Sequence, residues 1–299
     1  MHDLSLTLPD PARPVLIAGP TASGKSALAL RIAVAQGRVI INADALQVHE
    51  SWSVLTARPP AADLAQVPHF LYGHVPRGAD YSVGHWLRDV APLLARYPDA
   101  VIVGGTGLYL SALTEGLAAI PPTPPDIRAR ADALLRDRGP AAFLAGLDAQ
   151  TAARIDRQNP ARLQRAWEVL QATGRGLAAW QAETGPPLLP LEAATALLLM
   201  PGRDWLNDRI SARFAAMIRE GALEEARAAL PYWPPDAGQP SAPLWTRAIG
   251  ASELIAYLRG QISLAKAEAD ATLATRQYAK RQRSWFRNRM KAWQRHDIP

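Results

Sequence analysis

Short apolar runs alternate with helical patterns along the first third of the chain. Val15–Ala18, Val39–Asn42 and Ala100–Val103 are brief, rich in β-branched residues and bounded by turn residues. Such runs are typical of buried strands in a parallel sheet. A helical pattern over Ser26–Ala35 follows the first run, and the leucine-rich run Thr195–Met200 predicts a fourth strand in the same sheet. The pattern therefore indicates an α/β fold with a parallel sheet flanked by helices.

A region of different composition lies between the predicted strands Ala100–Val103 and Thr195–Met200. Two proline-rich stretches, Ile120–Pro125 and Gly185–Pro190, bound a region in which Ile127–Arg138 and Ala161–Thr173 have helical periodicity and many arginines. Proline clusters of this kind mark loops between elements. We predict a mainly helical insertion domain over residues 120–190.

The rest of the chain, residues 1–119 and 191–299, is predicted to form one core. From Asp204 onward the sequence has helical patterns to its end, interrupted by the proline-rich loop Pro231–Pro243. We therefore expect a helical C-terminal region attached to the α/β core.

The turn after the first strand carries a complete G-x-x-x-x-G-K-[ST] motif, placed between a strand and a helix as a phosphate-binding loop requires. Glycines let backbone N–H groups surround phosphate oxygens, and the helix N-terminus adds a favourable dipole. Lys25 would neutralise a di- or triphosphate, and Ser26 would hold Mg²⁺. The phosphate-binding candidates are Gly19, Pro20, Thr21, Ala22, Ser23, Gly24, Lys25 and Ser26. The predicted core is thus P-loop NTPase-like.

An acid at the end of a second buried strand usually helps a P-loop ATPase to hold its metal. Here the strand Ala100–Val103 ends in Gly104–Gly107 without one, and the nearby acid is Asp44, just after the strand Val39–Asn42. Asp44 would act as a metal ligand or a base, or else would cap a helix. Thr106 offers a hydroxyl near the ligand, or a helix cap.

Composition favours an anionic partner and excludes disulfide bonds and membrane-spanning helices. The formal charge of +6 favours an anionic partner, and a chain without cysteine has neither disulfides nor thiol chemistry, which fits a cytoplasmic location. No leader is evident in Met1–Pro14, and the longest apolar stretch, Ala193–Met200, is too short to span a membrane. The histidines, from His2 to His296, lack metal-ligand spacing.

The segment Arg276–Arg295 has eight basic residues, four aromatic residues and no acid. One basic face of a helix would contain Arg276, Lys280, Arg283, Arg287 and Lys291. Positive charge binds phosphates, and aromatic rings can stack on unpaired bases or pack inward. A solvated helix face is the alternative, but the net charge favours RNA.

Six motifs together make the chain resemble the tRNA dimethylallyltransferases, also called the IPP transferase family. They are Gly19–Ser26, Asn42–Val48, Val103–Leu110, Arg162–Ala166, Ala248–Gly250 and Lys280–Arg287. The matches follow the family's order from about Pro14 to Arg289. Ala45 stands where the family commonly has Ser, and His49 where it usually has Tyr.

The resemblance implies transfer of a dimethylallyl group from dimethylallyl diphosphate to the N6 amine of the adenosine 3′-adjacent to the anticodon, with release of diphosphate. It implies Asp44 as the general base and Thr106 as the threonine beside the diphosphate. Lys25 and Arg213 would stabilise the leaving group, with Ser23 and Mg²⁺ assisting.

The resemblance also implies a tRNA-binding set, in which Gln47 would read the adenine and the insertion domain would face the tRNA. The set is Asp44, Ala45, Leu46, Gln47, Ala161, Arg162, Leu163, Gln164, Arg165, Lys280, Arg281, Gln282, Arg283, Ser284, Trp285, Phe286 and Arg287. The expected partners are the anticodon stem-loop and dimethylallyl diphosphate, bound by a monomer.

Two other functions fit the same P-loop. A small-molecule kinase would bind ATP there and would leave the basic C-terminal segment without a role. A non-catalytic RNA-binding protein would bind tRNA without making a product. Prenyl transfer is the function that uses both features.

Overall fold

The structure is a computed structural model that describes residues 8–238 and 242–298. Residues 1–7 of the N-terminal segment Met1–Pro14, including His2, lie outside these residues, as do positions 239–241 of the predicted loop Pro231–Pro243. The chain divides into two compact units, one formed by Met1–Thr114 and Leu188–Pro299 and the other by Glu115–Pro187. Each is described by itself.

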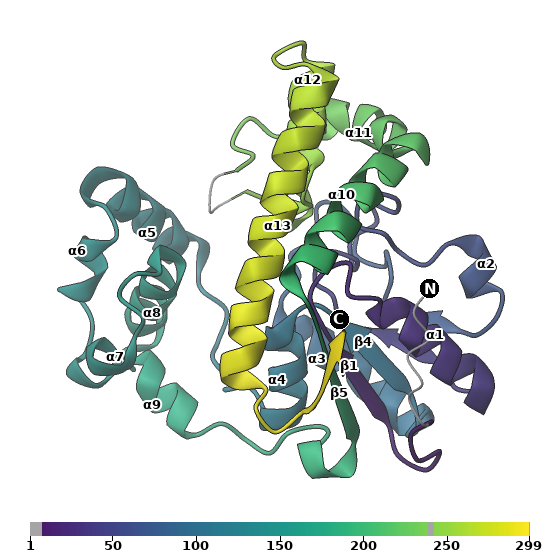
Figure 1. Cartoon of the computed structure of the whole chain (residues 1–299). Coiled ribbons are helices and arrows are strands. Elements are labelled where there is room, and N and C mark those ends of the chain that lie inside the picture. The colour runs from purple at the N-terminus through teal and green to yellow at the C-terminus, as the bar shows by residue number, and fades with distance from the viewer. Residues whose placement is uncertain (1–7, 239–241, 299) are drawn as a thin grey trace. The chain divides into compact units, whose positions relative to one another are not determined.

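The first unit is built on a parallel sheet, which in the described residues has six strands in the order β3-β2-β4-β1-β5-β6 (Figure 1). The strands are β1 (Val15–Ala18), β2 (Ile40–Asn42), β3 (His69–Phe70), β4 (Val101–Gly104), β5 (Thr195–Pro201) and β6 (Gln294–Ile298). The predicted α/β fold and its four strands are confirmed. The short β3 and the polar β6 carry no strand pattern and were not predicted.

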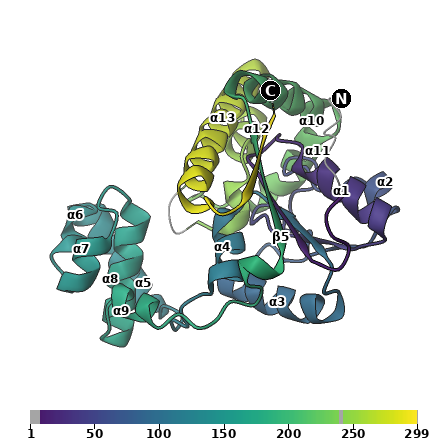
Figure 2. The same cartoon turned by 60° about the horizontal axis from the view of Figure 1, so that its bottom comes forward.

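Side chains alternate between the two faces of the sheet, as the pleat requires. Val15 and Ile17 of β1 pack with α1 (Lys25–Gln36) in one apolar cluster, and Leu16 packs in another cluster on the opposite face. That second cluster contains side chains of α3 (Val83–Arg96) and α4 (Gly107–Glu115). Figures 1 and 2 accordingly show α1 on one side of the sheet and α3 and α4 on the other.

The C-terminal part of this unit is mainly helical. Its helices are α10 (Arg203–Arg219), α11 (Ala222–Ala229), α12 (Ala251–Leu258) and α13 (Leu264–Arg289). Together with Trp52 and Leu55, these four helices enclose a third apolar cluster that contains Phe214 and Trp245. Short 3-10 turns lie at Leu191–Ala193, Leu230–Tyr232 and Leu244–Arg247, and the small helix α2, nearer the N-terminus, spans Ala61–Leu64.

The expectation of helix to the end of the chain is wrong for the last residues. α13 ends at Arg289, and β6 then pairs in parallel with β5, with Gln294 opposite Leu197. The reason is tertiary: β5 offers an open sheet edge, and backbone pairing with an edge needs no apolar alternation. Lys291 consequently lies beyond the helix, and the predicted basic face ends at Arg287.

The second unit is a small helical domain. Its helices are α5 (Pro125–Arg138), α6 (Ala141–Leu144), α7 (Ala149–Arg154), α8 (Pro160–Thr173) and α9 (Leu177–Ala182). Phe143, Leu163 and Trp167 form its core with Ile127 and Ala131. Within the described part of the chain, every helix is too short or too polar to cross a bilayer.

Candidate active site

The predicted phosphate-binding loop connects β1 to α1. Gly24 has φ 89° and Ala22 has φ 62°, so the backbone turns sharply before α1 begins at Lys25. Among the described residues, no side chain caps the N-terminus of α1. Because the first N–H groups of a helix need an acceptor, this end is available to phosphate oxygens.

Lys25 lies in a polarised environment at the start of α1. Burial lowers the pKa of its ammonium to about 8; Asp44 nearby opposes the shift, and the positive charge of Arg213 adds to it. Burial also lowers the pKa of Arg213, again against the effect of Asp44. Two cations and one carboxylate therefore share a partly buried site, and a bound anion would relieve the repulsion between the cations.

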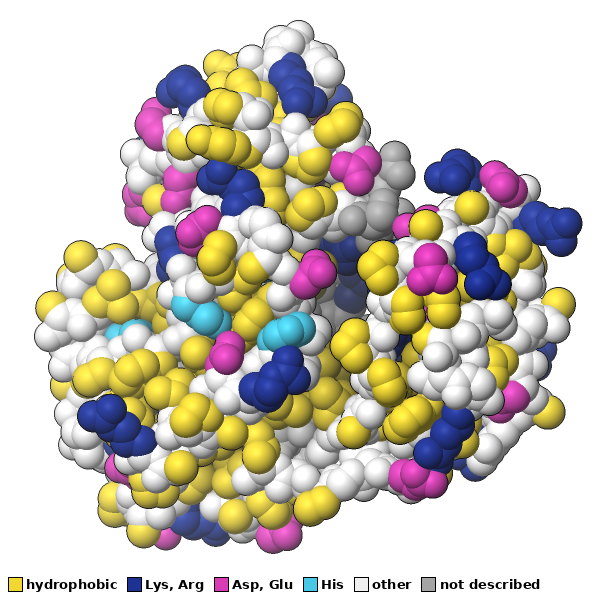
Figure 3. Space-filling model, turned by 180° about the vertical axis from the view of Figure 1, so that it is seen from behind, with side chains coloured by type: hydrophobic (Ala, Val, Ile, Leu, Met, Phe, Trp, Pro, Cys, Tyr) yellow, Lys and Arg dark blue, Asp and Glu magenta, His cyan; other side chains and the backbone are white. Residues whose placement is uncertain are grey.

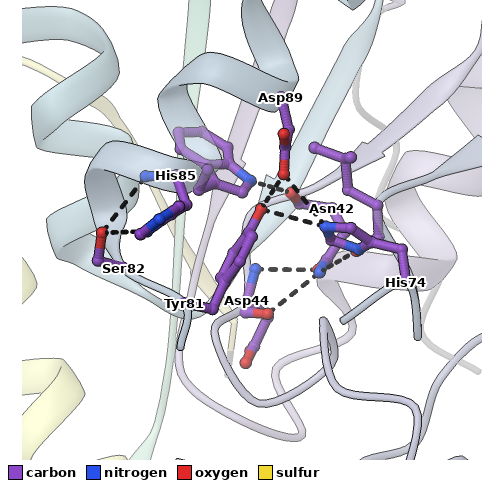
Figure 4. Close-up of polar contacts among 9 residues, drawn as sticks. Asn42, Asp44, His74, Tyr81, Ser82, His85 and Asp89 are labelled. Atoms are coloured by element: carbon purple, nitrogen blue, oxygen red, sulfur yellow. Dashed lines mark hydrogen bonds and ion pairs between the residues drawn. The ribbon is translucent and has the colours of Figure 1, made fainter. Parts of the chain in front are cut away.

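Asp44 follows directly from β2 and is held by its neighbours (Figure 4). Its N–H donates to Asn42 Oδ1 at 2.9 Å, and its Oδ1 accepts from the Leu46 N–H at 3.0 Å. The buried Asn42 in turn donates through Nδ2 to the Leu71 carbonyl, and its own carbonyl accepts from Trp86 Nε1 at 2.8 Å. The carboxylate is thus held through one oxygen by a backbone N–H, on a turn that Asn42 fixes to its own strand.

Thr106 lies at the end of β4, next to Asp44 in space. Its Oγ1 accepts from the Ala45 N–H at 2.9 Å. A Cβ at Gly104 would lie 2.0 Å from the Ala43 carbonyl oxygen, so only glycine permits the two strand ends to approach so closely. The threonine is therefore in direct contact with the loop that carries the carboxylate.

One cavity collects most of these groups. It is lined by Thr21, Lys25, Ser26, Asp44, Leu46, Gln47, Leu55, Thr56, Ile210, Arg213, Phe214, Met217, Ile249, Thr275 and Tyr278. Three of the four predicted catalytic residues, Lys25, Asp44 and Arg213, line it. Thr106 is not part of this lining, although its hydroxyl bonds to the N–H of Ala45, the residue after Asp44. The cavity unites polar groups of the P-loop with apolar groups from α10 and the third cluster, as an amphiphilic ligand requires.

Gln47 has a fixed orientation in this cavity. Its Nε2 donates to the carbonyls of Thr56 and Ala57, each at 2.9 Å. Both amide hydrogens are used, so the carbonyl oxygen is the atom that Gln47 can offer to a ligand.

A polar cluster lies beside Asn42 on the segment after β3. Tyr81 donates through its hydroxyl to Asp89 of α3 at 2.7 Å, and His74 Nε2 lies 3.1 Å from the same hydroxyl (Figure 4). The contacts tie the segment after β3 to α3. The cluster therefore supports the wall around Asn42 and does not enter the cavity.

The predicted basic segment of α13 divides between its two faces. Lys280, Arg281, Ser284 and Trp285 line a shallow open groove with Gln277 and Asn288, and Arg287 is exposed. Gln282 and Phe286 are buried, and Arg283 is partly buried. On the face seen in Figure 3, by contrast, basic and acidic side chains are interspersed.

Comparison with known proteins places the chain in a family. The IPP transferase model matches residues 47–289, and the isopentenyl transferase model matches residues 13–71. A tRNA dimethylallyltransferase of Cereibacter sphaeroides (strain KD131 / KCTC 12085) is 64% identical over 287 residues, covering 96% of this chain and 90% of that protein. The chain belongs to the IPP transferase family.

Two further relatives of this IPP transferase extend the match. A tRNA dimethylallyltransferase of Paracoccus denitrificans is 60% identical over 290 residues, covering 95% of this chain and 94% of that protein. The crystal structure of a tRNA isopentenylpyrophosphate transferase from Bacillus halodurans is 28% identical with a TM-score of 0.64, covering 96% of this chain and 90% of that one.

The helical unit of this IPP transferase presents only part of its predicted tRNA-binding segment. Ala161 and Arg162 are exposed on α8, whereas Leu163 and Gln164 are buried. Gln164 donates to Asp132 at 2.7 Å, and Arg165 bonds to Thr123. Leu163 and Gln164 are therefore internal to the unit and unavailable to a ligand at its surface.

Several cavity residues of this IPP transferase had no signal in the sequence. Phe214, Met217 and Ile249 are ordinary apolar positions of α10 and of the turn before α12. Helical periodicity predicts that such residues face inward, but not that they meet the P-loop. Tyr278 was identified only as an aromatic residue of the basic segment; burial and the nearby Asp44 raise its pKa.

Proposed function

We propose that this chain transfers a dimethylallyl group from dimethylallyl diphosphate to the exocyclic N6 amine of the adenosine 3′-adjacent to the anticodon in tRNA. The observation that carries the proposal is that Lys25 and Asp44 meet apolar side chains such as Phe214 in one cavity. A diphosphate with a short hydrocarbon tail matches that combination. Relatives named tRNA dimethylallyltransferase agree with it.

The reaction follows from these groups. The C1–O bond of the donor breaks and diphosphate departs, while N6 of the adenine forms a bond to C1. Lys25 and Arg213 would stabilise the negative charge of the departing diphosphate. Asp44 would accept the proton that N6 loses, as a general base. Apolar neighbours such as Met217 would enclose the dimethylallyl group and keep water from the allylic carbon.

A magnesium ion fits the same donor set. Ser26 and Asp44 supply hard oxygen atoms to one cavity, and Mg²⁺ commonly binds one or two protein oxygens together with phosphate oxygens. Among the described residues no cluster of three or more His, Asp or Glu forms a separate metal cage. Ser26 would hold Mg²⁺ against the bound diphosphate, where it would offset charge on the leaving group.

The adenine must leave its stack to reach Asp44. Gln47, whose carbonyl oxygen is its available group, would accept a hydrogen bond from the base, and Thr106 would keep the Asp44 loop in place beside it. Lys280 and Arg281, exposed on α13, would bind phosphates of the anticodon stem-loop, and the partly buried Trp285 beside them would stack on a base.

Three finer points belong to the same proposal. Arg162 on the helical unit would add a contact to the tRNA backbone, so that this unit faces the RNA. The enzyme would act as a monomer. It would work in the cytoplasm, where it would meet its tRNA substrate.

A transfer assay tests the proposal. Unmodified tRNA, Mg²⁺ and labelled dimethylallyl diphosphate should give label on the adenosine beside the anticodon without ATP. The Asp44→Asn variant should lose transfer while keeping tRNA affinity within a few-fold, and Asp63→Asn, on α2 outside the cavity, should behave as wild type. Consumption of ATP without transfer would instead support the small-molecule kinase.

A further inference from the structure

Gln282 occupies the inner side of a helix whose outer side is charged. It lies in the segment Lys280–Arg287, yet its side chain is only 6% exposed. Its neighbours Lys280 and Arg281 are exposed and line the surface groove. A buried amide is therefore placed among surface cations by the turn of α13, and it must find partners inside the protein.

Both ends of the Gln282 amide are paired with the backbone of the active site. Oε1 accepts from the Thr21 N–H of the P-loop at 2.9 Å. Nε2 donates to the Gly105 carbonyl, after β4, at 2.8 Å. One side chain thus joins the diphosphate-binding loop to the loop that carries Thr106.

The amide also lies close to the carboxylate of Asp44. A Cβ built at Gly105 would be 2.6 Å from Gln282 Nε2, 3.0 Å from Asp44 Oδ2 and 3.6 Å from the Gly19 carbonyl oxygen. The amide, the carboxylate and the P-loop therefore surround one point that only glycine leaves open. Gln282 thus touches the P-loop on one side and lies beside Asp44 on the other.

We propose that Gln282 is a positioning residue that fixes the separation between the P-loop and Asp44. The inference rests on the proposed transfer reaction, in which the donor carbon and N6 must be held in a near-attack arrangement between these two elements. Buried amide bonds hold such an arrangement because leaving either partner unpaired in the interior is costly. The link also connects the tRNA-facing helix to the diphosphate site.

Two variants of Gln282 separate positioning from tRNA binding and from simple packing. Gln282→Met keeps the length of the side chain and removes both hydrogen bonds. Gln282→Glu keeps an acceptor for the Thr21 N–H and loses the donor to Gly105. Gln261→Met, at an exposed glutamine after α12, is the matched control. The measurements are the single-turnover transfer rate at saturating donor and tRNA, the tRNA dissociation constant and the melting temperature.

We expect Gln282→Met to slow single turnover by about 10- to 100-fold, with tRNA affinity within about twofold of wild type. The rate of Gln282→Glu relative to wild type should rise from about pH 8 to about pH 6, because the carboxyl group that replaces the amide can again donate to Gly105 once it is protonated. Loss of packing alone would not make the ratio of the two transfer rates depend on pH. The ratio of the Gln282→Glu rate to the wild-type rate therefore tests the inference even if Gln282→Met fails to fold.

Two results would overturn the inference. Unchanged single turnover in Gln282→Met would show that the amide bonds do not set the reacting geometry. Weaker tRNA binding with a normal rate at saturation would make Gln282 a tRNA contact. Absence of transfer by the wild-type enzyme would instead refute the proposed function, so the two failures are distinguishable.

Discussion

Asn42 and Asp44 are joined by a pair of hydrogen bonds within one turn of chain. Asn42 Oδ1 accepts from the Asp44 N–H at 2.9 Å, and Asn42 Nδ2 donates to the Asp44 carbonyl at 3.1 Å. The same Nδ2 donates to Leu71 at 2.9 Å, so the strand end, the proposed base and the segment after β3 share one buried amide. The turn that presents the carboxylate is therefore built from its own strand.

Replacing Asn42 should destabilise the protein and displace Asp44. Asn42→Ala leaves the Asp44 N–H and the Leu71 carbonyl without partners in the interior, which should lower the free energy of unfolding by about 2 kcal/mol. Urea denaturation measures the change, and transfer activity should fall with it. Asn207→Ala, at a partly exposed position on α10, should change the free energy by less than about 0.5 kcal/mol. Equal effects of the two substitutions would contradict the assigned role of Asn42.

Lys25 should make diphosphate affinity depend on pH. Burial lowers its pKa to about 8 in the ligand-free protein, so the ammonium is present below this pH and is lost above it. A bound anion favours the charged form, and the affinity advantage of wild type over Lys25→Met should therefore be level below about pH 8 and then fall by up to tenfold per pH unit.

Calorimetric titration with inorganic diphosphate measures that advantage. Titration of the diphosphate itself cancels in the ratio between the two proteins. An advantage that stayed constant up to about pH 10 would show that Lys25 keeps its ordinary pKa.

Glu225 should matter far more than the adjacent Glu224. The Glu225 carboxylate accepts from the N–H groups of Ser53, Val54 and Leu55 at 2.7 to 3.0 Å. Glu225→Ala leaves three donors unpaired next to the cavity wall, and we expect a loss of about 2 to 3 kcal/mol with a raised KM for the donor.

The control lies one residue away. Glu224 is exposed, and its Oε1 forms a long ion pair with Arg227 Nη1 at 3.8 Å. Exposed pairs of this kind contribute little, so Glu224→Ala should lower the free energy of unfolding by less than about 0.5 kcal/mol. Thermal unfolding and donor kinetics compare the two. Similar losses for both variants would mean that the segment Ser53–Leu55 does not depend on the carboxylate.

The outer face of α13 should account for part of the salt dependence of tRNA binding. Lys280→Ala and Arg281→Ala each remove one cation that would bind a phosphate, so each should reduce the slope of log affinity against log salt by about 0.7 to 0.9. Trp285→Phe should weaken binding with little change in slope, because stacking releases no counterions. Filter binding across a salt series checks this, with Arg96→Ala on α3 as the control. An unchanged slope in both basic variants would exclude α13 from the tRNA interface.

The sequence by itself determined the local elements and the place of the predicted phosphate site between β1 and α1. Strands such as Val15–Ala18 were predictable because short apolar runs between turn residues leave the backbone few alternatives. The P-loop was predictable because its glycines, Lys25 and Ser26 act at fixed spacing within one turn. The position of Asp44 near the P-loop was predictable as well, because it follows a strand and the carboxyl ends of parallel strands meet at one edge of the sheet.

Only the tertiary structure decided which side chains meet. Phe214 and Met217 line the same cavity as Lys25 because α10 packs beside the P-loop. Gln282 bonds to Thr21 of that loop because α13 turns this side chain inward between exposed cations. β6 forms because β5 leaves an open edge, although its own sequence is polar. Periodicity reports the conformation of a segment, whereas these contacts depend on burial against residues distant in the chain, which no local pattern encodes.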